Sequence, residues 1–387
     1  MKAMRLWLVA GVLALAACGG NSNNGNGGTG NNPTPNVSPG DMGAGVKNYQ
    51  NQSQTAISQA GAKLGKLFNN FPSGIASVPG LTQSITSLTA GQDKNQILAG
   101  LRAFSKVFAQ STDALPRGIY DCTSGTCPPT PAPSSNLVVK WIPETSIATL
   151  TVVWTSTVGA HNVSDTTGAT LQEVPSQAEV TLDYGTARVM DIKLSVAWHA
   201  SNCVPGKYLL DVPDDLKISG FIKDSSGAPI LDLRNLKLSV SNTAITTLGD
   251  FTVTGDSGSV TSSWNISING TLTRDDKRCG AVDDFNGTSV DFDFKTSSNT
   301  GSGKTDAELK FSASNFDAKP PAIKITGGYL NLGGKVVTFQ GTLDDANNNC
   351  VPGENVTLTF AGGQTQSLEA FLIANGSKTG NCAPAKK

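Results

Sequence analysis

The sequence predicts a mainly β protein with an N-terminal helical region, in which a large antiparallel β meander closes as a barrel, a half-barrel or a two-layer sandwich. Three observations predict this fold class. Apolar residues recur at three- and four-residue steps between residues 41 and 117, which is the spacing of amphipathic helices. From Gly118 onward they alternate with polar residues, as in strands with one buried face. Turn sequences such as Asn286-Gly287 separate the alternating runs.

The N-terminus has the pattern of an export signal. Lys2 and Arg5 precede a short apolar run at residues 6–14, and the quartet Leu15-Ala-Ala-Cys18 follows. A charged start, a short apolar stretch and small residues before a cleavage site mark a segment that directs secretion. We therefore expect residues 1–17 to be a signal peptide. An ordinary secretion signal beside an unrelated cysteine is the alternative.

The quartet LAAC resembles the lipobox of bacterial lipoprotein precursors. The resemblance implies transfer of a diacylglyceryl group to the Cys18 thiol, cleavage before Cys18, and acylation of the new amine by a fatty acid such as palmitate. Several acyl chains on one cysteine anchor a protein stably to a membrane. Gly19 is not the aspartate that retains some lipoproteins at the inner membrane, which favours the outer membrane or the cell surface. The motif carries no information about the fold of the mature domain.

Residues 18–40 are predicted to form a disordered linker between the lipid and the domain. Fourteen of the twenty-two residues from Gly19 to Gly40 are glycine or asparagine. Such a segment cannot bury enough apolar surface to offset the entropy of ordering it. As a flexible coil it would span about 26 Å root-mean-square.

Two or three helices are predicted in residues 41–117. A first amphipathic stripe consists of Val46, Tyr49, Ser53, Ala56, Ala60, Leu64 and Leu67. A second helix is predicted at Asp93–Gln110, with Ile97, Leu101, Phe104 and Phe108 on one face, and a shorter one around Leu81, Ile85 and Leu88. Such stripes usually face a protein core, and contact with a membrane surface is the alternative.

Residues 118–387 are predicted to form one antiparallel β domain of about fifteen strands with weak internal repeats. The sequence NCVPG occurs at Asn202–Gly206 and again at Asn349–Gly353. Cys203, Cys279 and Cys350 each follow an alternating strand, at intervals of 76 and 71 residues. We interpret these sites as disulfide-bonded corners between strands.

Six cysteines besides Cys18 suggest three disulfides in an oxidising compartment. They are Cys122, Cys127, Cys203, Cys279, Cys350 and Cys382. Fifteen pairings are possible, and our prediction is Cys122–Cys127, Cys203–Cys279 and Cys350–Cys382. No CxxC pair occurs and the chain has only two histidines, so we predict no metal site and no cofactor.

Calcium binding by the polar loops is an alternative interpretation of the repeated corners. Two loops could supply oxygen ligands, the first through Asp344, Asp345, Asn347, Asn349 and Glu354 and the second through Asp275, Asp276, Asp283 and Asp284. The EF-hand pattern fails, because its sixth position from Asp345 is Cys350 and its twelfth is Val356.

Two stretches carry weak catalytic resemblances. Gly255-Asp-Ser-Gly-Ser259 resembles the GDSGG stretch of trypsin-like serine proteases, and Ala197-Trp-His-Ala200 is similar to the histidine motif of that family. The resemblance implies Ser257 as nucleophile and His199 as base. Ser259 replaces the second glycine, and we expect a hairpin turn there instead. The acid pairs Asp214-Asp215 and Asp291/Asp293 could serve a glycosidase, although a solvated strand face is the simpler interpretation. His161 is expected in a polar loop. We predict no catalytic residue and no enzymatic activity.

Composition narrows the function further. The formal net charge is −1, without a clustered basic face, so nucleic acid is not a predicted partner. The sequence therefore predicts a cell-envelope lipoprotein, held to the membrane by its N-terminal lipid, with a structural or adhesive binding role toward another envelope protein. A carrier for an apolar ligand, such as a lipid or pigment, is the alternative.

Overall fold

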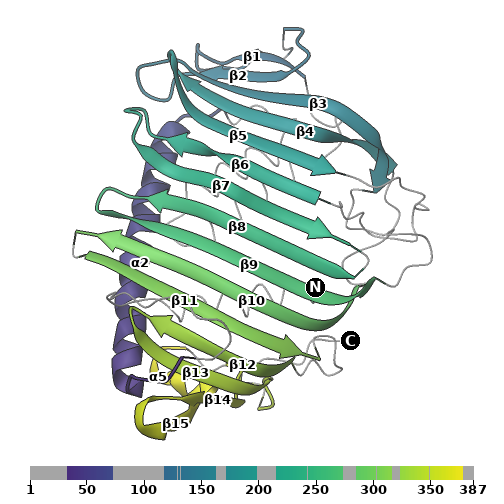
Figure 1. The fold of residues 1–387 in the computed structure, drawn as a ribbon. Helices are drawn as coiled ribbons and strands as arrows, with labels where there is room; N and C mark the ends of the chain where they lie inside the picture. Colours follow the sequence, from purple (N-terminus) through teal and green to yellow (C-terminus); the bar gives the residue numbers. More distant parts are fainter. Residues whose placement is uncertain are drawn as a thin grey trace.

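A computed structural model of the chain describes residues 33–72, 117–128, 130, 132–162, 171–197, 215–241, 243–272, 285–301, 303–315, 323–347 and 349–377. These residues form a single fifteen-stranded sheet whose strands lie in the same order in space as in the sequence. Only the first pair, β1 and β2, is parallel, and every other pair is antiparallel. A long helix crosses one face of the sheet near the ends of the strands (Figure 1).

The described elements follow each other as α2, fifteen strands and a short helix. The helices are α2 (Pro39–Leu67), the 3₁₀ turn η2 (Ala361–Gly363) and α5 (Leu368–Ala374). The strands are β1 (Gly118–Asp121), β2 (Leu137–Trp141), β3 (Ala148–Asn162), β4 (Leu171–Tyr184), β5 (Ala187–Ala197), β6 (Asp215–Lys223), β7 (Pro229–Val240), β8 (Ala244–Thr254), β9 (Gly258–Leu272), β10 (Phe285–Thr300), β11 (Gly303–Ser314), β12 (Ile323–Leu332), β13 (Lys335–Leu343), β14 (Asn355–Thr359) and β15 (Thr365–Ser367).

The two ends of the strands differ in how they are connected. From β4 to β13, tight hairpins join each even-numbered strand to the next at one end of the sheet, as at Tyr184–Ala187 and Leu332–Lys335. Cys350 belongs to a connection at the opposite end, after β13, whereas Cys203 and Cys279, which follow β5 and β9 in the sequence, lie outside the described residues. The predicted repeat thus corresponds to four strands, with one of these cysteines after every fourth strand.

Helix α2 forms because its apolar residues share one face and its first turn is capped. Ser38 accepts a hydrogen bond from the Asp41 amide through its hydroxyl, as an N-cap residue does. Six of the seven residues of the predicted stripe are buried, namely Val46, Tyr49, Ala56, Ala60, Leu64 and Leu67, and Ser53 is half-buried. Burial of this face against the sheet stabilises the helix more than its intrinsic propensity does.

The helix contacts successive hairpins along the sheet. Gln59 accepts hydrogen bonds from the Ser257 amide and hydroxyl in the β8–β9 turn, at 3.0 and 2.9 Å. Lys63 pairs with Asp256 of the same turn at 2.8 Å and with Asp224 of the β6–β7 turn at 3.6 Å. The hydrogen bond that Lys63 donates to Asp256 raises the pKa of Lys63. These contacts fix the helix across the hairpin end of the sheet (Figure 1).

Two apolar clusters lie between the helix and the sheet. The first joins the N-terminal half of α2 to strands β7–β14 and α5, and the second joins its C-terminal half to β1–β7. In the second cluster, Trp141 donates its indole N–H to the Asn69 carbonyl at 3.1 Å and packs edge-on against Phe71.

A polar group interrupts the apolar contact near the middle of α2. The Tyr49 hydroxyl lies 2.6 Å from the Thr296 hydroxyl of β10, which also lies 3.2 Å from Ser262 of β9. Ser262 and Thr296 are buried, and Ser298, on the same strand face as Thr296, is fully buried. The buried Tyr49 hydroxyl therefore requires this pairing, because an unpaired buried hydroxyl is costly.

The mainly β fold with an N-terminal helix is confirmed, as is a meander of fifteen strands. The predicted closure as a barrel is wrong for the described residues, since β1 and β15 do not pair and the sheet stays open. These edge strands have only four and three residues, too few to close a sheet of this size. The predicted helix at residues 93–110 lies outside the described residues.

Two smaller differences concern segment boundaries. Ordered structure begins before the predicted linker end at residue 40, since Val37 is already buried and α2 starts at Pro39. His161, predicted in a loop, belongs to the end of β3. Among the described residues, no helix is long and apolar enough to cross a membrane.

Replacing Tyr49 with phenylalanine tests the polar contact beneath α2. Tyr49→Phe removes one hydroxyl while Thr296 keeps its bond to the Thr261 carbonyl at 3.0 Å, so we expect a loss of about 1 kcal/mol in the free energy of unfolding. Urea unfolding followed by circular dichroism measures it. Asn51→Ala, on the exposed side of the same helix, is the control and should change stability by less than about 0.5 kcal/mol.

Candidate functional site

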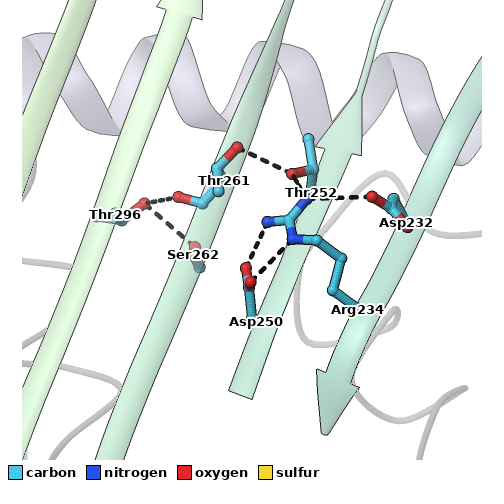
Figure 2. Close-up of polar contacts among 7 residues, drawn as sticks. All are labelled: Asp232, Arg234, Asp250, Thr252, Thr261, Ser262 and Thr296. Carbon is cyan, nitrogen blue, oxygen red and sulfur yellow. Dashed lines mark hydrogen bonds and ion pairs between the residues drawn. The ribbon is translucent and has the colours of Figure 1, made fainter. Parts of the chain in front are cut away.

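The sheet face that points away from α2, here called the outer face, carries polar and paired charged side chains. Arg234 of β7 is central to it (Figure 2). Its Nε donates to Asp250 at 2.9 Å, and Nη1 donates to Asp232 at 3.1 Å and to the Thr252 hydroxyl at 3.0 Å. The Thr252 hydroxyl lies 2.9 Å from that of Thr261. The chain therefore joins charged and hydroxyl groups across β7, β8 and β9.

A local irregularity of β7 places Arg234 between the two carboxylates. The pairing of β7 with β8 shifts register between Leu233 and Asn235, so Arg234 is the extra residue of a β-bulge. The hydrogen bond from Arg234 holds the pKa of Asp250 below its ordinary value. The same contact raises the pKa of Arg234. Both side chains are 40% exposed, so the pair contributes little to stability.

Similar ion pairs recur along the outer face. They are Arg188–Asp183, Lys193–Glu179, Lys237–Asp215, Lys295–Glu308 and Lys304–Asp306. Burial and the neighbouring Glu308 raise the pKa of Tyr329, on the same face, to about 12. Because these charges neutralise one another locally, the face offers hydroxyl, amide and paired charged groups without a strong net field.

The face toward α2 is apolar and only partly covered between β6 and β10. We call its partly buried side chains the half-buried row: Leu216, Ile218, Leu231, Leu233, Leu238, Val253, Trp264 and Phe294. Trp264 donates its indole N–H to Thr247 at 3.1 Å and packs edge-on against Phe251. Its ring lies where a side chain on Gly249 would be, so glycine is required there.

The second NCVPG sequence is a structural corner in which each residue has a local role. The Asn349 side-chain oxygen accepts a hydrogen bond from the Val351 amide at 2.9 Å, and Val351 is buried in the first apolar cluster. Cys350 adopts φ +72° and is disulfide-bonded. Gly353 adopts φ +109°, and a β-carbon there would lie 2.8 Å from that of Leu368. The prediction of a disulfide-bonded corner therefore fits this copy, while Asn202–Gly206 lies outside the described residues.

The acidic side chains of this loop hold its backbone and its asparagines. Asp345 accepts the amides of Asn349 and Cys350, at 3.0 and 3.3 Å. Glu369, at the start of α5, accepts the side-chain amides of Asn347 and Asn349. Within the described ranges, no group of three or more His, Cys, Asp or Glu side chains is placed to hold a metal ion. Asp345, Asn347 and Asn349 thus have structural contacts in this loop. Asp344 Oδ1 and Glu354 Oε2 are buried without a hydrogen-bond partner among the described residues.

The catalytic candidates are placed in structural contacts or lie outside the described residues. Ser257 is in the β8–β9 hairpin turn and bonds to Gln59, while His199 lies outside. Asp291 accepts the Ser312 hydroxyl at 2.6 Å, and Asp293 lies 3.9 Å from Lys295. Asp214 lies outside as well, and Asp215, next to it, pairs with Ser239 and Lys237, which lower its pKa.

The predicted disulfide between Cys122 and Cys127 is present. Its Cα atoms lie 4.2 Å apart, and it closes the loop after β1. Cys18, Cys203, Cys279 and Cys382 lie outside the described residues, so lipidation and the other two pairings stay predictions. Comparison with protein-family models, with curated proteins and with solved structures found no match for this chain.

The Arg234 pair predicts a defined pH dependence. Since the folded state lowers the pKa of Asp250, the pair adds stability above the unfolded-state pKa of about 4 and loses it as pH falls through the lower folded value. Arg234→Gln should therefore cost no more than about 1 kcal/mol at pH 7, and the difference from the wild type should shrink below about pH 4. Urea unfolding at several pH values measures this, with Lys47→Gln on α2 as the control. A difference that grows on acidification would contradict it.

A matched pair of glycine substitutions tests the corner. Gly353→Ala and Gly376→Ala both place a side chain at positive φ, +109° and +105°, but only the first meets Leu368. We expect a cost of about 1 kcal/mol for Gly376→Ala and about 1–3 kcal/mol more for Gly353→Ala. Thermal and urea unfolding would compare them, and equal losses would show that the Leu368 contact is unimportant.

Proposed function

We propose that this protein is a lipid-anchored component of the bacterial cell envelope, at the outer membrane or cell surface, which binds another envelope component without catalysis. The LAAC quartet at Leu15–Cys18 supports the anchor. The outer face supports the binding role. It extends across many of the strands, and it carries hydroxyl, amide and charged side chains, many of which are paired within the face.

The observation that carries the binding role is the continuous polar chain around Arg234. A face whose only purpose is solubility needs scattered charges and gains little from cross-strand pairing. Here Arg234, at a β-bulge, orients Asp232, Asp250 and Thr252 toward one another (Figure 2). The folded sheet already holds these donors and acceptors in place. A partner that binds this face therefore loses less conformational entropy on binding than it would with mobile side chains.

A second candidate function is a carrier for an apolar ligand. The half-buried row favours it, because Trp264, Phe294 and the leucines of β7 are apolar side chains on the α2 side of the sheet that are only partly covered. In this interpretation the open sheet acts as a half-barrel, and the ligand lies on the side of α2. Large apolar patches that stay accessible commonly mark ligand sites or protein contacts.

Anchoring is tested by Cys18→Ala in the full chain. We expect the wild type to sediment with membranes and the variant to be exported but released from them. The released variant also tests the carrier alternative by native mass spectrometry before and after organic extraction. A bare mass short by six hydrogens supports three disulfides and the binding role, whereas mass lost on extraction identifies an apolar cargo.

A matched pair of asparagine substitutions tests which face binds. Asn265→Glu adds an unpaired charge to the outer face on β9, and Asn51→Glu adds the same charge to the exposed side of α2. Co-sedimentation of the Cys18→Ala chain with isolated envelope layers is the measurement. We expect Asn265→Glu to weaken binding about tenfold, which corresponds to about 1.4 kcal/mol. Equal binding by both variants would argue against the outer face.

A further inference from the structure

The chain enters the ordered domain at one particular edge of the sheet. Asn36 donates its backbone N–H to the Val336 carbonyl at 3.1 Å and accepts the Val336 amide through its side chain at 2.7 Å. Its side-chain amide also donates to the Gly334 carbonyl at 2.7 Å. These three bonds fix the start of the domain to the β12–β13 hairpin.

The residues after Asn36 continue this attachment. Val37 is only 4% exposed, and its carbonyl accepts the Ala361 amide at 3.0 Å. Gly43, in the first turns of α2, packs against the Asn375 side chain at the end of α5. The start of the chain, β13–β15 and α5 therefore form one unit at one edge of the sheet, opposite β1 (Figure 1).

The length of the preceding segment limits how far this edge can move from a lipid anchor. Residues 18–32 are fifteen residues, and a flexible coil of that length spans about 21 Å root-mean-square. The sheet has fourteen strand-to-strand steps of about 4.8 Å, so its two edges are about 67 Å apart. The segment thus spans about a third of the width of the sheet. It therefore keeps the edge at which the chain enters closer to the lipid anchor than the opposite edge.

We propose that the edge formed by β13–β15 and α5 faces the lipid surface, and that the edge formed by β1–β3 is the membrane-distal end. The inference rests on the proposed anchor at Cys18. In this orientation the strands run roughly along the membrane and the sheet rises from it, which leaves the outer face accessible from the side. The β2–β3 hairpin, with Ile142 and Ile147 exposed, is then the part that extends farthest.

Energy transfer to a labelled membrane measures this orientation. The lipidated full chain would be placed in phosphatidylethanolamine/phosphatidylglycerol vesicles that carry an acceptor dye on a headgroup. A donor would be attached through p-azidophenylalanine at either Ile373 of α5 or Ile147 of the β2–β3 hairpin, two exposed isoleucines near opposite edges. We expect clearly stronger transfer from position 373. Equal transfer, or stronger transfer from position 147, would overturn the proposal.

Two controls separate this proposal from the anchor itself. Duplication of residues 19–32 lengthens the segment between the anchor and the domain, so transfer from position 373 should fall toward that from position 147. Cys18→Ala should abolish vesicle flotation and all transfer. If that variant still floats, the anchor is wrong. If flotation depends on Cys18 but the two positions transfer equally, the anchor holds and only the orientation fails.

Discussion

The contact of α2 with the hairpin end of the sheet is the interaction on which the rest of the structure depends. A sheet with one apolar face must bury that face against a second layer. A 29-residue helix is about 43 Å long, enough to cross many strands that lie about 4.8 Å apart. Its Tyr49 meets Thr296 of β10, Asn69 just after its end meets Trp141 of β2, and both apolar clusters include its residues.

The way in which the helix attaches explains why the two faces differ. Its polar contacts concentrate on turns, through Gln59 and Lys63, and on one hydroxyl group at Tyr49. Since α2 covers the hairpin end of the strands, the middle of β6–β9 receives less cover, and its leucines stay partly exposed. The outer face has no such covering layer among the described residues, so its side chains satisfy one another across strands.

Sequence reasoning succeeded where the signal is periodic and failed where it depends on register. The stripe from Val46 to Leu67 and the alternation in β9 or β11 follow from local spacing, so α2 and the strand count were predictable. The Arg234–Asp250 pair was missed, because it needs the β7–β8 register and a bulge that no local pattern shows. The closure of the sheet into a barrel was mispredicted for a related reason, because apolar and polar residues alternate along strands in the same way in open and closed sheets.

The repeated corner shows how a sequence motif can be mistaken for a site. In NCVPG the side chains bond to the loop's own backbone, the disulfide and positive φ belong to Cys350, and Gly353 makes room for Leu368. Each feature that resembles ligand chemistry is thus used to turn the chain between β13 and β14. The Arg234 cluster is different, because its members come from separate strands and converge on an exposed face. Most polar groups of the loop serve to fold it, and among the described residues only Asp344 Oδ1 and Glu354 Oε2 of this loop are buried without a hydrogen-bond partner. The Arg234 cluster instead holds groups of separate strands in place on an open surface.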